Sequence, residues 1–321
     1  MVRRRLARVI AARYRFFSVC FSGALPRIGR LTPSSDPTAP RAANRRGILA
    51  MSAAMASFVA NDSLVKLVSE SLPAAQLIFL RGVFATMLLL VMAFALGAHR
   101  RLASLGDRRV LLRTGFDGFA TLAYLTSLFH LPLANATAIN MATPLFITLF
   151  AVVGFRERVP AARWLAIVTG FVGVLLVVQP AGAAFNAYAL LCLGGTLLHA
   201  GRDLTTRTID ARIPAILITL STAVTVTVLA GLWSLVQPWQ PPSALQLTQL
   251  AAASVFLSGG YYLIIIAMRG GEMSLIAPFR YTGLLFALVL GWALWGDVPN
   301  ALAWVGIVML VGAGVVMVRR R

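Results

Sequence analysis

The side chains best able to do chemistry are ionisable groups that stand inside long apolar runs. Arg280 lies in the run from Ser274 to Asp297, two residues after Pro278. A charge near the middle of a membrane-spanning helix costs about 2.5–3.5 kcal/mol on insertion scales, so it is expected where the helix faces protein, water or a ligand. Pro278 also leaves the carbonyl of Ser274 without its helical donor. Arg280 and Tyr281 together would suit an anionic or zwitterionic metabolite with a planar group.

A second candidate is an acidic residue on a polar helical stripe. Asp117, Thr121 and Tyr124 follow one another at spacings of four and three, which places them on one helix face. Asp117 would bind a cationic substrate group or cycle a proton. Alternatively it would pair with Arg81 or Arg113 for structural reasons. Both interpretations stay open.

Two further polar groups fall within the first two apolar spans. Asn61 and Asp62 precede Lys66, and Asp62 and Lys66 are four residues apart, a spacing that allows them to pair. We expect Asn61 or Asp62 to line a cavity. Arg81 follows Pro73 by eight residues. It would anchor a substrate carboxylate or phosphate, or it would hold two parts of the protein together through an acidic partner.

The remaining candidates are a histidine, an asparagine and two tyrosines. His199 titrates near neutral pH and would relay protons, or it would simply hydrogen-bond to a neighbouring helix. Asn140 lies 140 residues before Arg280, which is the equivalent position in the internal repeat described below. Tyr261 and Tyr262 fall in the middle of a span, where they would present a stacking face. The candidate substrate-binding residues are therefore Asn61, Arg81, Tyr124, Asn140, Tyr261, Tyr262, Arg280 and Tyr281, and the candidate proton-coupling residues are Asp62, Asp117 and His199.

Several kinds of chemistry lack their sequence signals. Cys20 and Cys192 are far apart, and histidine occurs only three times, so neither a metal site nor a disulfide framework is indicated. The single lysine, Lys66, follows a valine, which excludes the Gly-Lys pair of an ATP-binding loop. A membrane-embedded enzyme would need His, Asp, Glu or Cys clustered at a membrane face, and the sequence has no such cluster. We expect no catalytic site, metal or cofactor.

Composition indicates what must position these side chains. The chain has 321 residues, of which 59% are hydrophobic and 12% charged, against about 25% charged in soluble domains. Its mean hydropathy is +0.82. Apolar runs this long predict an all-α integral membrane protein. The net charge of +19 comes from arginines, most of which lie near the N-terminus or in short loops beside apolar helices, and this pattern favours membrane topology over nucleic-acid binding.

Ten apolar spans follow a basic tail. The tail, residues 1–46, holds eleven arginines and one acidic residue, and its composition favours disorder; it would be a cytoplasmic extension or precede the true start near Met51. Arginines occur in the loops after the second, fourth, sixth and eighth spans, whereas the alternate loops hold neither arginine nor lysine. The positive-inside rule then predicts that both termini are cytoplasmic. The predicted spans are 47–67, 73–98, 110–129, 131–154, 163–180, 185–201, 213–236, 246–268, 273–295 and 301–318.

The chain also repeats at an offset of 140 residues. Trp164 and Trp304 each follow an acidic residue by seven positions, and Pro73 matches Pro214 after a slip of one residue. Each unit holds five spans, an odd number, so the second unit must enter the membrane from the opposite side. The sequence therefore predicts two five-helix inverted repeats, residues 47–180 and 185–319, a construction common among transporters. Small residues in the fifth and tenth spans would permit close helix packing or a homodimer contact.

These features resemble the drug/metabolite transporter superfamily with its EamA-type domains. The run from Ala138 to Arg158 looks like that family's fourth helix and the acidic loop after it, and the run from Pro278 to Asp297 looks like a branch that includes S-adenosylmethionine and riboflavin carriers. The resemblance implies a secondary active transporter of the bacterial inner membrane. It would move a small organic metabolite, either amino-acid- or nucleoside-like, by alternating access. A non-transporting membrane subunit or a ligand sensor is the alternative.

Overall fold

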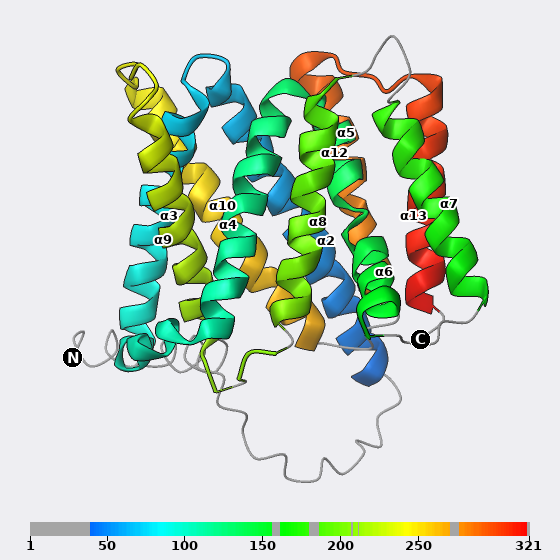
Figure 1. Ribbon diagram of the computed structural model, residues 1–321, viewed down its shortest axis with the longest axis horizontal. Helices are drawn as coiled ribbons and strands as arrows, with labels where there is room; N and C mark the ends of the chain where they lie inside the picture. The colour runs from blue at the N-terminus through cyan, green and yellow to red at the C-terminus, as the bar shows by residue number, and fades with distance from the viewer. Residues whose placement is uncertain are drawn as a thin grey trace, which may run out of the picture.

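The computed structural model describes residues 39–155, 161–179, 186–206, 208–210, 212–269 and 276–319, and within these ranges it is helical, with no β-strand. The helices stand side by side as a bundle, and the start of α2 and the end of α13 lie at the same edge (Figure 1). The α-helices are α2 (Ala39–Ser69), α3 (Ala74–Ala95), α4 (Arg108–His130), α5 (Leu133–Asn140), α6 (Thr143–Phe155), α7 (Ala161–Val178), α8 (Tyr188–Thr206), α9 (Ala215–Ser234), α10 (Ala244–Arg269), α12 (Thr282–Trp295) and α13 (Ala301–Arg319). Two 3₁₀ segments are η1 (Ala98–Gly106) and η2 (Ala277–Tyr281).

The bundle has the distribution of apolar and charged side chains that an apolar surrounding requires. Within the part of the chain that the structure describes, six stretches are long and apolar enough to cross a membrane. Large apolar side chains such as Val91, Leu165 and Val308 are about two-thirds exposed. Arg81 and Asp117, in contrast, are only 5% and 3% exposed. Apolar groups outside and charged groups inside fit a helical protein surrounded by lipid, as the sequence predicted. The six stretches are Asn44–Ser69, Ala74–Ala95, Leu133–Phe150, Ala215–Ser234, Ala244–Ile264 and Pro278–Trp295.

Prolines determine where several helices begin or break. Pro73, Pro132 and Pro214 each stand directly before a helix, α3, α5 and α9 respectively. Pro144 cannot donate a backbone hydrogen bond, and the predicted fourth span is accordingly divided into α5 and α6. Pro278 likewise lies in the 3₁₀ turn η2 that leads into α12. The described residues thus form eleven α-helices, where the sequence predicted ten helical spans.

The helices pack in pairs that join distant parts of the chain. α2 packs along α10, α4 along α8, α3 along α9, and α7 along α13. The last pair is very close: a Cβ on Gly306 would lie 2.5 Å from the carbonyl oxygen of Gly173. Such contact requires glycine, as in other membrane helix pairs. α2 starts at Ala39, so its first eight residues fall within the segment predicted as a tail.

Candidate functional site

The first buried polar group is the Asp117 cluster, formed by Arg113, Asp117, Arg202 and Thr222. Asp117 Oδ1 lies 2.9 Å from Arg202 Nη1, and its Oδ2 lies 3.1 Å from Arg113 Nη1. Thr222 Oγ1 donates a 3.0 Å hydrogen bond to the same Oδ2. Arg202 also pairs with Asp203 at 2.8 Å. Both carboxylate oxygens of Asp117 are therefore occupied by guanidinium groups, which tie α4, α8 and α9 together.

The second group is the Asp62 chain, formed by Arg81, Asn61, Asp62 and Tyr124. Tyr124 Oη donates a 2.8 Å hydrogen bond to Asp62 Oδ2, and Asn61 Nδ2 donates a 2.9 Å bond to Asp62 Oδ1. Arg81 Nη1 donates a 3.3 Å bond to Asn61 Oδ1. The chain thus connects α2, α3 and α4, and the neutral amide of Asn61 stands between the carboxylate of Asp62 and the guanidinium group of Arg81.

The charges of the Asp62 chain differ from those of the Asp117 cluster in their pairing. Among the residues that the structure describes, neither Asp62 nor Arg81 has an ion-pair partner within 4.0 Å. Arg81 Nε is buried and makes no hydrogen bond within the same part of the chain. Buried charges are normally paired, because an unpaired one keeps the full cost of leaving water. The Asp62 chain is therefore the more open of the two groups to a ligand.

His199 stands between the two groups. Its Nδ1 lies 3.0 Å from Asn140 Oδ1. His199 Nε2 lies 4.0 Å from Asp117 Oδ1, and its ring centroid is 6.3 Å from that of Tyr124. A polar path thus runs through the bundle interior, and it includes seven of the eleven predicted site residues: Asn61, Asp62, Arg81, Asp117, Tyr124, Asn140 and His199.

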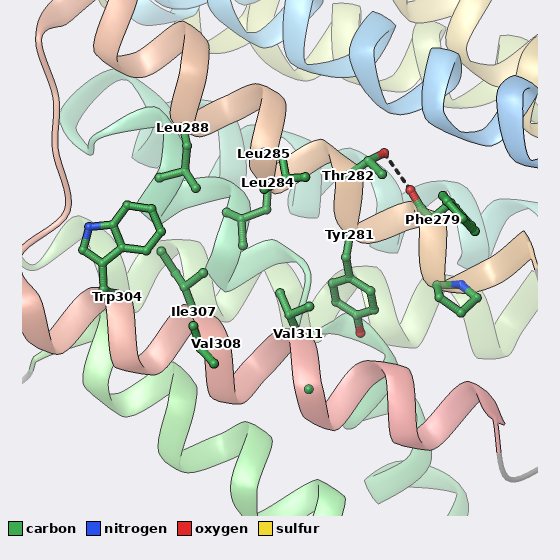
Figure 2. A pocket seen from close by; sticks show the side chains of 12 residues that line it. Phe279, Tyr281, Thr282, Leu284, Leu285, Leu288, Trp304, Ile307, Val308 and Val311 are labelled. Atoms are coloured by element: carbon green, nitrogen blue, oxygen red, sulfur yellow. Dashed lines mark hydrogen bonds between the residues drawn. The ribbon is translucent and has the colours of Figure 1, made fainter.

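Three of the other four predicted residues lie elsewhere, whereas Tyr261 borders the same polar interior, within electrostatic range of Arg81 and Asp117. Arg280 is exposed on η2. Tyr281 points towards α13, where its ring packs against Gly314, and it lines an apolar groove of about 580 Å³ between α12 and α13 (Figure 2). Tyr261 meets Phe58 edge-on, with ring centroids 5.2 Å apart. Tyr262 packs on an apolar cluster formed by α3 and α9.

A third polar contact joins α2 to the C-terminal end of α12. Lys66 Nζ donates to the carbonyl of Leu131, lies 3.9 Å from Asp297 Oδ2, and stands 4.9 Å from the centre of the Trp295 ring. Trp295 Nε1 donates a 2.6 Å hydrogen bond to Glu70 Oε1. Lys66 is thus engaged with Asp297, and the spacing of four residues from Asp62 has no corresponding ion pair within the described ranges.

Sequence reasoning missed two members of the Asp117 cluster, Arg202 and Thr222. It placed Arg202 at the membrane boundary because the predicted span ended at residue 201, whereas α8 continues to Thr206. The spacing from His199 to Arg202 is three residues, which places both on one helix face, and that signal identifies Arg202. Thr222 is a single threonine in an apolar helix and had no comparable signal.

A helical bundle with an apolar surface and polar residues in its interior is typical of a multi-pass membrane protein. The EamA-like transporter family matches residues 45–179 and again residues 186–319. The chain therefore belongs to the EamA-like transporter family, within the drug/metabolite transporter superfamily, and is a transporter of the bacterial inner-membrane type rather than an enzyme.

The similar proteins found by sequence comparison are also exporters or transporters. The chain is 27% identical over 281 residues to a pseudopaline exporter of Pseudomonas aeruginosa, covering 86% of this chain and 97% of the relative. It is 26% identical over 211 residues to a riboflavin transporter of Rhizobium johnstonii, covering 66% and 70%. It is 24% identical over 262 residues to an S-adenosylmethionine uptake transporter of Rickettsia felis, covering 81% and 87%. A solved crystal structure shares the fold, with a TM-score of 0.57 at 17% identity over 84% of this chain and 96% of the other.

Proposed function

We propose that the protein is a secondary active transporter of a small organic metabolite. Two five-helix halves, residues 47–180 and 185–319, would cross the membrane ten times in total and alternate the access of a central site between its two faces. The observation that carries this proposal is the buried polar path, because helices of both halves contribute to it. α2, α3, α4 and α5 supply the Asp62 chain, Asp117 and Asn140, while α8 and α9 supply His199, Arg202 and Thr222.

The packing of the helices supports an inverted repeat. In the predicted register, α2 and α8 are the first helices of the two halves, and α4 and α10 are the third. α2 packs on α10 and α4 packs on α8, so each first helix meets the third helix of the other half. The second helices, α3 and α9, pack on each other, as do the fifth, α7 and α13. This reciprocity is what a two-fold axis between the halves would produce.

The two acidic residues of the polar path, the buried Asp117 and the half-buried Asp62, would then have different tasks. Asp117 binds two guanidinium groups, so a proton arriving there would have to displace an ion pair. We assign Asp117 to holding α4 and α8 together. Asp62 is bound by the neutral groups of Asn61 and Tyr124, so it is the better proton site if transport is driven by a proton gradient.

Counterflow into proteoliposomes tests the function. Vesicles that contain the purified protein and an unlabelled candidate substrate should take up the same labelled compound faster than empty vesicles. The names of the relatives suggest S-adenosylmethionine and riboflavin as first compounds, together with amino acids and nucleosides. Binding of a compound without any counterflow would instead support a ligand sensor or a non-transporting subunit.

A further inference from the structure

We propose that the Asp62 chain binds the zwitterionic head of an amino-acid-like substrate, with the substrate carboxylate on Arg81 and its ammonium group on Asp62. This inference rests on the proposed transport function and names the class of compound that the site accepts. It is carried by a buried charge on Arg81 and a half-buried charge on Asp62, neither of which has an ion pair within 4.0 Å among the described residues, although a hydrogen-bonded path through Asn61 links them.

Arg81 supplies the anion-binding half of the site. Its side chain is buried inside a membrane protein, yet the described contacts of its guanidinium group amount to one hydrogen bond, to the neutral amide of Asn61. Its Nε has no partner there. A guanidinium group carries five N–H donors in a planar fork that matches a carboxylate. Arg113 and Arg202 are only half-buried, yet each is paired with a carboxylate, which is how this chain satisfies a guanidinium group when the role is structural.

Asp62 supplies the cation-binding half. Each of its oxygens accepts one hydrogen bond, from Asn61 and from Tyr124, and both donors are uncharged. A carboxylate offers about four lone-pair sites, so roughly two remain for a ligand. An ammonium group with three donors would use them and would neutralise the charge.

Asn61 fixes the separation of the two halves. Its amide oxygen accepts from Arg81 while its amide nitrogen donates to Asp62, so a single carboxamide group separates the cation from the anion. An amino-acid head carries its ammonium group and its carboxylate on one carbon atom, a similarly short separation. A ligand with only one of these charges would leave either Arg81 or Asp62 unpaired, and the site would discriminate against it.

The test uses the purified full-length protein and matched compounds. Thermal unfolding in detergent is measured with each free amino acid, with S-adenosylmethionine and with riboflavin. For every compound with an amino-acid head that raises the melting temperature, two derivatives are compared with it: the carboxamide, which lacks the carboxylate, and the N-acetyl derivative, which lacks the ammonium group. We expect stabilisation by at least one compound with a zwitterionic head, and roughly 10- to 100-fold weaker binding of both derivatives.

Variants then place the compound on the two residues. Arg81→Gln should bring the affinity for the free compound down to that of its carboxamide, and Asp62→Asn should bring it down to that of the N-acetyl derivative. Arg101→Gln is the control, because Arg101 is exposed and donates to the main-chain oxygen of Arg212. It should leave binding unchanged. If Arg81→Gln or Asp62→Asn fails to fold, the affinities of the wild-type protein for the free compound and its two derivatives still decide the question.

Three results would overturn the inference: equal binding of the free and N-acetyl compounds, stabilisation by riboflavin alone, or no stabilisation by any zwitterionic compound. Counterflow separates this failure from failure of the transport function. Riboflavin counterflow without amino-acid binding would leave transport standing and remove the zwitterion site. Zwitterion binding without counterflow would keep the site and remove transport.

Discussion

Two isosteric substitutions, Asp117→Asn and Asp62→Asn, should have very different effects on stability. Both acids are in the buried polar path, but Asp117 is paired with two arginines whereas Asp62 accepts from the neutral donors of Asn61 and Tyr124. Asp117→Asn would leave Arg113 beside neutral groups such as Thr222 and the carbonyl of Ile218. Removing one member of a buried ion pair typically costs about 3–5 kcal/mol.

Asp62→Asn should cost much less. The new amide oxygen can still accept from Tyr124, so about one hydrogen bond is lost, worth roughly 0.5–1.5 kcal/mol. Removal of a half-buried charge that has no ion pair offsets part of this loss. We therefore expect a difference of at least about 2 kcal/mol between the two variants, or more than tenfold in the unfolding equilibrium constant.

Cys192 provides the assay, because it is a free and buried thiol that becomes reactive only when the bundle opens. A thiol-reactive dye would follow thermal unfolding in detergent, in a Cys20→Ser background. At roughly 2 °C per kcal/mol, Asp117→Asn should lower the melting temperature by about 6 °C or more. If Asp62→Asn lowers the melting temperature as much as Asp117→Asn does, the assignment of Asp117 to a structural role and of Asp62 to ligand binding is wrong.

The helix packing, the polar path and the loop charges lead to three further predictions. Gly306→Ala should lower the free energy of unfolding by about 1–3 kcal/mol, because its new methyl group would meet the Gly173 carbonyl. Gly312→Ala in the same helix is the control, since no atom of the described residues lies within 4 Å of the position of its methyl group. Thermal unfolding of the two variants is compared. Asp62→Asn should abolish any pH dependence of counterflow while the protein stays folded in the membrane; a pH profile identical to that of the wild type would assign the proton elsewhere. A fluorescent protein fused after the last residue should be fluorescent and alkaline phosphatase at the same place inactive, because arginine-rich loops predict a cytoplasmic C-terminus; the reverse pattern would invert the topology.

The class of the fold could be predicted from sequence because a membrane helix must satisfy its own backbone and hide few charges. Each of the ten predicted spans overlaps a helix, and long apolar runs were sufficient for that. Hydropathy alone did not reveal the break between α5 and α6, because the two residues at the break, Met141 and Ala142, are apolar. Pro144 was the local signal for that break.

For the interior polar groups, sequence predicted the members better than it predicted which member contacts which. A charged residue inside an apolar run is informative by itself, and this rule identified Asp62, Arg81 and Asp117. Which charge meets which depends on helix packing that a single sequence does not encode. Of the two partners that sequence offered for Asp117, the structure shows Arg113, and it adds Arg202 from a helix that is distant in sequence.

Counterflow of a labelled zwitterionic compound in proteoliposomes tests the transport proposal most directly. The compound is the one that stabilises the purified protein most, and Arg81→Gln supplies the matched vesicles. We predict that uptake of the labelled compound requires unlabelled compound inside the vesicles. This uptake should be lost with Arg81→Gln and kept with Arg101→Gln. Vesicles that bind the compound but show no exchange would contradict alternating access.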